Sequence, residues 1–337
     1  MEKIRIVLPE GWSSQHGTAE WARDLRLPAW ETLLARGRRQ LCAAESAEAA
    51  LCRAFGVSAD ERGEWPLAAL TRQADGLPGA AGDYWLRADP VHLALQRDKV
   101  LALPAGAITR EEAAAWTAAL NAHLAAEGVS LFTPQPQRGY LRTRQPPGIL
   151  TVPLSQVLGR DIRQHQPQGE QARYWQRLSN EIQMVLHAHP LNAAREARGQ
   201  LPVNALWLWG AGQAAATGCD WTRVESDWPL AELLAHSAGR PFSAWSGRWV
   251  PDSGRQWLFF GGLQHSLWQG DRESWRTALQ QFEQGYARPL LSALRRGQLR
   301  QLELELLTAE ASLRYELTPL RVWQIWRRPQ PLLKLVQ

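Results

Sequence analysis

The stretch from His187 to Gly212 concentrates side chains that could bind a ligand. Asn192 and Arg195 follow Pro190, which stops the preceding helix, and a short apolar run then ends at Gly210. An arginine fork can bind a phosphate or a carboxylate through two hydrogen bonds, and an asparagine amide can both donate and accept. Asn192 and Arg195 are therefore candidate ligand-binding residues. The alternative is that the polar side chains of this stretch only cap the helix and contact solvent.

The elements on either side of these residues can be predicted from apolar periodicity. Apolar residues from Leu178 to Leu186 recur at helical spacing and predict an amphipathic helix. The run Ala205 to Trp209 predicts a strand buried on both faces, as in a parallel α/β sheet. Open α/β sheets bind ligands at the carboxyl ends of their strands, so we expect the loop from Gly210 to lie at a ligand site.

This stretch resembles a signature of the archaeal-type, cofactor-independent phosphoglycerate mutases, a family of the alkaline phosphatase superfamily. Within that group it is similar to a bacterial branch known as regulatory proteins of the RpfE type. The residues that carry the resemblance are His189-Pro190-Leu191-Asn192, Arg195, Gly199, Pro202, Asn204 and Trp207 to Gly212. Further segments follow the family in the same order: Ile4 to Leu8 with Glu10-Gly11, Leu27 to Trp30, Gly63 to Leu67, Gly82-Asp83 and Leu86 to Asp89.

The resemblance implies a fold and a domain organisation. It predicts a three-layer α/β/α core of the alkaline phosphatase type, formed by residues 1–90 and 151–337. A small inserted α+β domain is expected over residues 91–150. Within it, a capping box at Thr109 to Glu112 predicts a helix to about Glu127. Further along, a helix from Arg272 to Ala287 is expected to end before Pro289, and alternating leucines predict two paired strands near the C-terminus.

The resemblance also implies a ligand site. The segments that flank the substrate site in the family carry Arg87, Asp89, Arg138, Tyr140, Asn192 and Arg195 in this sequence. We expect Arg87 and Arg195 to converge on one cleft and to bind a phosphorylated three-carbon acid or another anion. Arg195 would then be solvated, and its removal would cost little stability. The alternative is that each arginine forms an ordinary surface ion pair.

The metal centre of the family is where this sequence departs most. The mutases hold two metal ions with Asp and His ligands and use a serine nucleophile. Alignment on Asp271 places Gln264 and Trp268 at ligand positions, and the last ligand motif falls on Thr308 to Ser312, with no Asp or His. Glutamine, tryptophan and alanine cannot supply the carboxylate and imidazole ligands that such ions need. We therefore predict a dismantled metal centre and no cofactor, with Glu10, His265 and Asp271 as weak candidate ligands.

Two functional hypotheses follow. The first is a non-catalytic regulatory or ligand-sensing protein whose partner is a phosphorylated small molecule or another protein. The second is an active mutase or phosphoesterase with two divalent metal ions in a site rebuilt from Glu10, His265, Asp271, His187 and His189. Besides these two, a nucleic-acid-binding regulator is the weakest hypothesis, because the arginines behind the net charge of +5 are scattered along the chain.

Composition predicts a cytoplasmic protein. The three cysteines lack a Cys-x-x-Cys spacing, so neither a disulfide framework nor a zinc site is indicated. The N-terminus has no signal-type apolar core, and no apolar run is long enough to span a bilayer, so we expect no membrane partner. Most of the 18 tryptophans occupy positions typical of a packed core.

Overall fold

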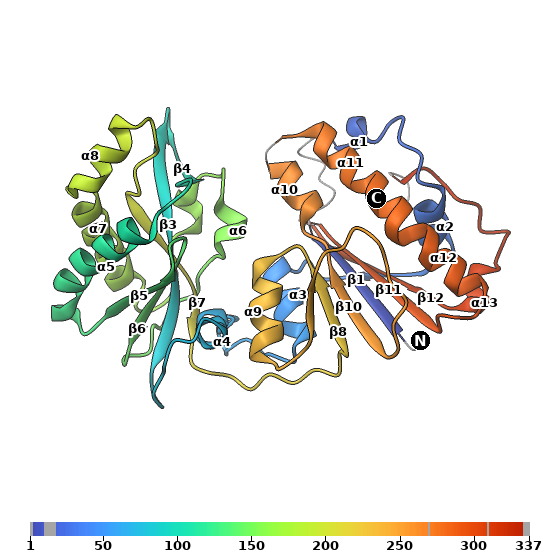
Figure 1. Cartoon of the computed structure of the whole chain (residues 1–337), viewed down its shortest axis with the longest axis horizontal. Coiled ribbons are helices and arrows are strands. Elements are labelled where there is room, and N and C mark those ends of the chain that lie inside the picture. The colour runs from blue at the N-terminus through green and yellow to red at the C-terminus, as the bar shows by residue number, and fades with distance from the viewer. Residues whose placement is uncertain (1–2, 10–17, 269, 309, 333–337) are drawn as a thin grey trace. The chain divides into compact units, whose positions relative to one another are not determined.

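The computed structural model describes residues 3–9, 18–268, 270–308 and 310–332, and the chain divides into two compact units (Figure 1). The first unit comprises Met1–Phe55 and Gly218–Gln337, and the second is inserted between them as Gly56–Thr217. The Gly218 N–H donates to the Phe55 carbonyl at 2.9 Å, so the chain leaves and re-enters the first unit at adjacent points. The inserted unit is thus wider than the 91–150 segment expected from the sequence.

The first unit is built on a seven-stranded sheet with the order β2-β12-β11-β1-β10-β8-β9. Strands β11, β1, β10, β8 and β9 are parallel to one another. At one edge of the sheet β12 pairs antiparallel with β11, and β2 pairs antiparallel with β12. The predicted C-terminal strand pair is confirmed as β11 and β12. The strands are β1 (Lys3–Pro9), β2 (Arg38–Cys42), β8 (Arg223–Ser226), β9 (Phe242–Ala244), β10 (Arg255–Phe259), β11 (Gln301–Leu307) and β12 (Ser312–Leu317).

Helices cover both faces of this sheet and form three layers (Figure 1). Ile4, Ile6 and Leu8 of β1 are buried against α2, α11 and α12 on one face. Helices α3 and α9 lie on the other face, where Phe55 packs edge-on against Trp257. The helices are α1 (Thr18–Trp21), α2 (Pro28–Arg36), α3 (Ala47–Ala54), α9 (Pro229–Ser237), α10 (Gly262–Trp268), α11 (Arg272–Phe282), α12 (Arg288–Arg295) and α13 (Pro319–Val322).

The sequence predicted that the helical segment from Arg272 would end before Pro289, and this prediction is wrong. A π-helical turn, Glu283–Ala287, joins α11 to α12 without a break. Pro289 then falls in the first turn of α12, where it has no N–H to donate to the preceding turn, and the Gly285 carbonyl in that turn accepts from the Trp249 N–H at 2.7 Å. The π-helical turn places the buried Glu283 carboxylate at the N-terminus of α2, where it accepts from the backbone N–H groups of Ala29 and Trp30 at 3.0 and 2.9 Å.

The inserted unit contains an antiparallel sheet in the order β4-β3-β6-β5, with β7 paired to β3. Its elements are α4 (Leu67–Ala74), β3 (Tyr84–Gln96), β4 (Lys99–Pro104), α5 (Arg110–Leu124), β5 (Ser130–Gln135), β6 (Arg138–Thr143), α6 (Leu154–Val157), α7 (Ala172–His187), α8 (Pro190–Ala197) and β7 (Ala205–Gly212), with 3-10 turns at Ala125–Glu127 and Ile162–His165. Side chains of α5 and α7 pack on one face of the sheet, and those of α4 pack on the other.

Two sequence predictions meet opposite outcomes in this unit. The capping box is confirmed, since Thr109 and Glu112 each accept from the other's backbone N–H. The placement of Ala205 to Trp209 in a parallel sheet is wrong, because β7 runs antiparallel to β3. An apolar run signals burial and does not specify the direction of the partner strand. Among the described residues, no helix has the length and apolar character needed to cross a membrane.

Candidate functional site

Arg87 and Asp89, two of the predicted ligand-binding residues, form a buried ion pair on β3. They lie two positions apart on one strand, so both side chains point to the same face of the sheet. The Arg87 Nη2 atom lies 2.7 and 2.9 Å from the two carboxylate oxygens of Asp89. Burial lowers the pKa of Arg87, but the nearby Asp89, together with Tyr140 and Asp75, more than offsets this effect, and the pKa is raised. The guanidinium is therefore charged, and Asp89 is its counter-ion.

Aromatic side chains enclose this ion pair. The Arg87 guanidinium lies 5.2 Å from the ring centre of Tyr140 and 4.9 Å from that of Trp209. The Trp209 indole N–H donates to Asp89 Oδ2 at 2.8 Å. The cation–π contacts to Arg87 and the indole hydrogen bond to Asp89 thus further stabilise this ion pair.

Tyr140 and Arg138 converge on a second carboxylate, Asp75. The Tyr140 hydroxyl donates to Asp75 Oδ2 at 2.5 Å, and the Nε atom of Arg138 lies 3.2 Å from the same oxygen. Burial raises the pKa of Tyr140, so the phenol remains protonated and acts as a donor. Arg87, Asp89, Asp75, Arg138 and Tyr140 thus form one polar cluster, which we call the β3–β6 cluster. It has two arginines and two carboxylates, so an incoming anion would compete with carboxylates that are already in place.

Asn192 and Arg195 lie away from the β3–β6 cluster. The Asn192 amide joins α8 to the start of β7 by donating to the carbonyls of Leu186 and Val203 and accepting from the Val203 N–H. Arg195 is 1% exposed and lies over the Trp116 ring of α5. Trp116 belongs to the core on one face of the sheet, whereas Tyr140 packs on the other.

The structure therefore does not bring Arg87 and Arg195 together on one cleft. Every nitrogen of the Arg195 guanidinium donates to a protein group: Nε to the Leu201 carbonyl, Nη1 to the Ala107 carbonyl and Glu112, and Nη2 to the Ala105 carbonyl. Four of its five N–H donors are used within the protein, and the side chain is 1% exposed. In the structure Asn192 and Arg195 are buried and hold α8 to neighbouring segments, so neither contacts solvent as the alternative interpretation expected.

Glu64 is a buried carboxylate that the sequence reasoning did not select. It is 4% exposed and accepts from the backbone N–H of Thr151, the hydroxyl of Thr151 and the backbone N–H of Ala211. Burial raises the pKa of Glu64 to about 7, and the bonds from Thr151 and Ala211 only partly counter that effect. The sequence signal was available, because Glu64 is a charged residue within Gly63 to Leu67, one of the segments that carry the resemblance.

The carboxyl-end edge of the parallel sheet is where the resemblance placed the metal ions. Glu10 lies outside the described residues, as does the side chain of His265 in α10. Asp271 caps α11 by accepting from the Ser274 N–H at 3.0 Å, and hydrogen bonds from the Ser274 hydroxyl and N–H lower its pKa. Gln264, at a predicted ligand position, is a buried amide. No group of three or more potential metal ligands occurs in the described part of the chain.

Two features at the same edge escaped the sequence analysis. Asp227, directly after β8, accepts from the Gly261 N–H at 2.6 Å and so ties the ends of β8 and β10 together. Trp245 follows β9 and stacks on Phe260 with ring centres 4.6 Å apart. Neither residue belongs to a motif, and only the strand order brings them near each other.

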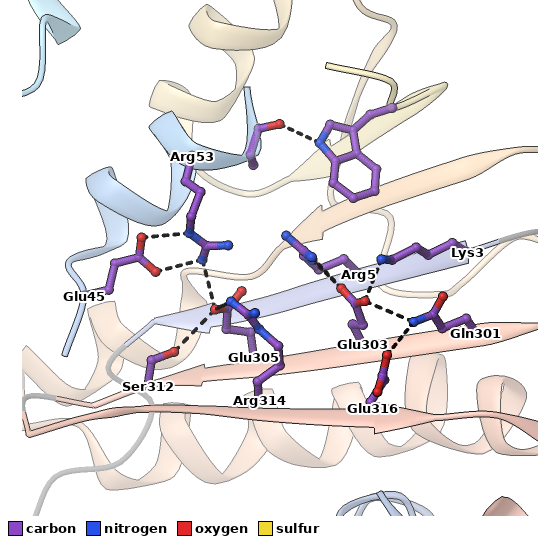
Figure 2. A network of polar contacts seen from close by, with 12 residues as sticks. Lys3, Arg5, Glu45, Arg53, Gln301, Glu303, Glu305, Ser312, Arg314 and Glu316 are labelled. Carbon is purple, nitrogen blue, oxygen red and sulfur yellow. Dashed lines mark hydrogen bonds and ion pairs between the residues drawn. The ribbon is translucent and has the colours of Figure 1, made fainter. Parts of the chain in front are cut away.

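A network of charged side chains lies between the sheet of the first unit and α3 (Figure 2). Glu303 contacts Lys3 and Arg5 at 2.5 and 2.6 Å. Glu305, which is 1% exposed, contacts Arg53 and Arg314, each at 2.9 Å. Burial alone raises the pKa of Glu305, and these two arginines reverse that effect and lower it.

Part of the positive charge of the chain is neutralised within this network. Lys3, Arg5, Arg53 and Arg314 each contact an internal carboxylate, and Arg53 also forms two bonds to Glu45. These side chains neutralise carboxylates on β11 and hold α3 against the sheet. They do not form a basic surface for nucleic acid.

Comparisons with known proteins agree with the resemblance. Residues 55–192 match the family model of the 2,3-bisphosphoglycerate-independent phosphoglycerate mutases, and this segment falls almost entirely within the inserted unit. A probable mutase of that kind from Geobacter sulfurreducens is 40% identical over 67 residues, which are 20% of this chain and 17% of the relative. One from Methanosarcina acetivorans is 26% identical over 226 residues, 63% of this chain and 56% of the relative.

Segments of the chain are thus similar to these mutases. The matched segments span less than two thirds of the relatives' own length. The PH0037 protein of Pyrococcus horikoshii shares the fold, with a TM-score of 0.52 and 13% identity over 94% of this chain and 87% of that protein. A cofactor-independent phosphoglycerate mutase from Thermoplasma acidophilum aligns over 94% of this chain and 90% of its own, at 15% identity and a TM-score of 0.47. The chain thus has a three-layer α/β/α unit with an inserted α+β unit, a fold that it shares with the PH0037 protein.

Proposed function

We propose that this protein is a phosphoglycerate-mutase-like regulatory or ligand-sensing protein, of the RpfE type, that has lost metal-dependent phosphoryl transfer. The observation that carries the proposal is the identity of the residues at the resembled metal positions. Gln264 and Trp268 stand where the mutases have ligands, and Thr308 to Ser312 contains neither Asp nor His. Phosphoryl transfer in a two-metal site depends on cations that stabilise the attacking and leaving oxygens.

The β3–β6 cluster supports the same proposal. In a sensor of free phosphorylated acids, arginine donors should face the ligand without a counter-ion. Here Asp89 and Asp75 already contact Arg87 and Arg138. This favours a partner protein over a free anion as the ligand, with a phosphorylated small molecule as the second possibility.

The alternative proposal, an active mutase or phosphoesterase with a rebuilt two-metal site, is less well supported. Two of its five candidate ligands cap helices: Asp271 caps α11, and the His189 Nδ1 atom accepts from the Leu191 N–H at the start of α8. A side chain that caps a helix loses that bond when it turns to a metal ion.

Metal content and turnover of the full chain, measured together, test the proposal. The protein is purified in the presence of manganese or cobalt, analysed for bound metal, and assayed with 2- and 3-phosphoglycerate. We expect substoichiometric metal and no turnover above background. Two tightly bound ions per chain, with turnover that a chelator abolishes, would establish the alternative.

Asp271→Ala is the matched variant for this assay. Under the proposal it changes stability alone, by about 1 kcal/mol for a lost helix cap. Under the alternative it also abolishes turnover and lowers metal content.

A further inference from the structure

Four large apolar side chains are exposed within seven positions, at and directly after α13. Leu320, Trp323, Ile325 and Trp326 are 86%, 59%, 68% and 73% exposed. Single exposed apolar residues are ordinary on a soluble protein, whereas a contiguous group marks an interaction site. We call these four residues, together with Arg295, Arg296, Arg321, Arg327 and Arg328, the α13 surface.

The backbone that carries the α13 surface is firmly attached to the first unit (Figure 1). Val322, between the exposed residues, is fully buried, and its carbonyl accepts from Arg36 Nη1 at 2.5 Å. Arg327 donates to the carbonyl of Gly37, and Leu332 returns to the core. The exposed side chains therefore project from a fixed segment, so a partner that binds them does not have to order it.

The α13 surface is positively charged. Between Thr318 and Leu332 the sequence contains three arginines and no Asp or Glu. Helix α12 packs against α13 and ends at the exposed pair Arg295 and Arg296. Arg295 lies close enough to Arg36 to add to the lowering of the Arg36 pKa, which burial mainly causes.

We propose that the α13 surface docks the protein onto an anionic lipid bilayer. Tryptophan is enriched where a bilayer meets water, and leucine and isoleucine gain by entering the acyl boundary. Arginines around them are attracted to anionic headgroups. This proposal departs from the expectation of no membrane partner, because the absence of a long apolar run excludes a spanning helix and does not bear on docking at the bilayer surface.

Other occupants fit the α13 surface less well. A second copy of the chain, related by a twofold axis, would place the same arginines against each other. A single-stranded nucleic acid could stack on Trp323 and Trp326, but Leu320 and Ile325 offer no ring for a base. Only the bilayer uses the aliphatic, aromatic and basic side chains together.

Cosedimentation of the full chain with vesicles tests the proposal. We expect binding to phosphatidylcholine vesicles that contain phosphatidylglycerol, weaker binding to phosphatidylcholine alone, and loss of binding as salt is raised. Trp323→Ser with Trp326→Ser, and separately Arg296→Gln with Arg328→Gln, should each weaken binding by about tenfold or more. These side chains are exposed, so thermal melting should confirm that both variants fold.

A matched control removes equally exposed apolar side chains elsewhere. Leu95 and Met184 of the inserted unit are 77% and 72% exposed, and Leu95→Ser with Met184→Ser should bind vesicles as the unaltered chain does. The proposal is overturned if the unaltered chain ignores anionic vesicles at low salt or if the tryptophan variant binds undiminished. Binding to a single-stranded oligonucleotide in place of vesicles, or a dimer that the tryptophan variant dissolves without any vesicle binding, would also overturn it.

Discussion

Replacing Arg195 should strongly destabilise the inserted unit, contrary to the expectation that this arginine is solvated. Arg195→Met keeps an unbranched side chain against the Trp116 ring and removes the guanidinium. The change leaves Glu112, which is 6% exposed, without its 2.9 Å partner, and it leaves the carbonyls of Ala105 and Leu201 without the donors that Arg195 supplies. Breaking a buried ion pair by removing one partner costs about 3–5 kcal/mol. We expect a loss of free energy of unfolding in that range.

Arg198→Met is the matched control. Its side chain is 56% exposed and contacts the other oxygen of the same carboxylate at 3.0 Å. An exposed ion pair contributes at most about 1 kcal/mol, so this variant should lose little stability. Urea unfolding followed by tryptophan fluorescence measures both variants. If Arg195→Met loses no more than Arg198→Met, the buried pair does not carry the stability that its geometry implies.

The pH dependence of stability gives a second readout of the Arg195 variant. Burial raises the pKa of Glu112, but bonds from Thr109 and Arg195 outweigh it, so the folded-state pKa lies below the usual value. A lowered carboxyl pKa stabilises the fold above the unfolded pKa, and this contribution is lost as the pH falls through the folded pKa. Unfolding measured from neutral to acid pH should therefore show a smaller acid-induced loss in Arg195→Met than in the unaltered chain. An unchanged acid dependence would contradict the role given to Arg195.

Two further predictions concern the inserted unit. Asn204→Ala should lower the free energy of unfolding by about 1–3 kcal/mol, because the Asn204 amide accepts from the Leu93 N–H and donates to the Leu93 carbonyl; an unchanged urea midpoint would contradict this. Glu64 should make stability fall as the pH rises from about 4 towards 7, by up to about 3 kcal/mol, because its raised folded-state pKa favours the protonated form. Glu64→Gln should flatten that slope, and an equal slope in the variant would exclude Glu64 as its source.

The sequence by itself determined the local elements. The capping box at Thr109 fixed the start of α5, apolar spacing fixed α7, and alternating leucines fixed the pairing of β11 with β12. In each case residues close together in the sequence predict the element, because a helix or a hairpin is stabilised by contacts between residues a few positions apart. The family resemblance added the fold class, since it draws on motifs spread along the whole chain.

Tertiary structure decided where the candidate residues go. Arg87 and Arg195 look alike in the sequence, yet Arg87 lies against Tyr140 on one face of the sheet and Arg195 against Trp116 on the other. Asp89 and Glu112 turn both arginines into structural ion pairs, and each pair depends on which side of a strand or helix a residue occupies. That choice is made by the packing of the whole unit, because burying a charge is favourable only where an opposite charge and hydrogen-bond partners meet it.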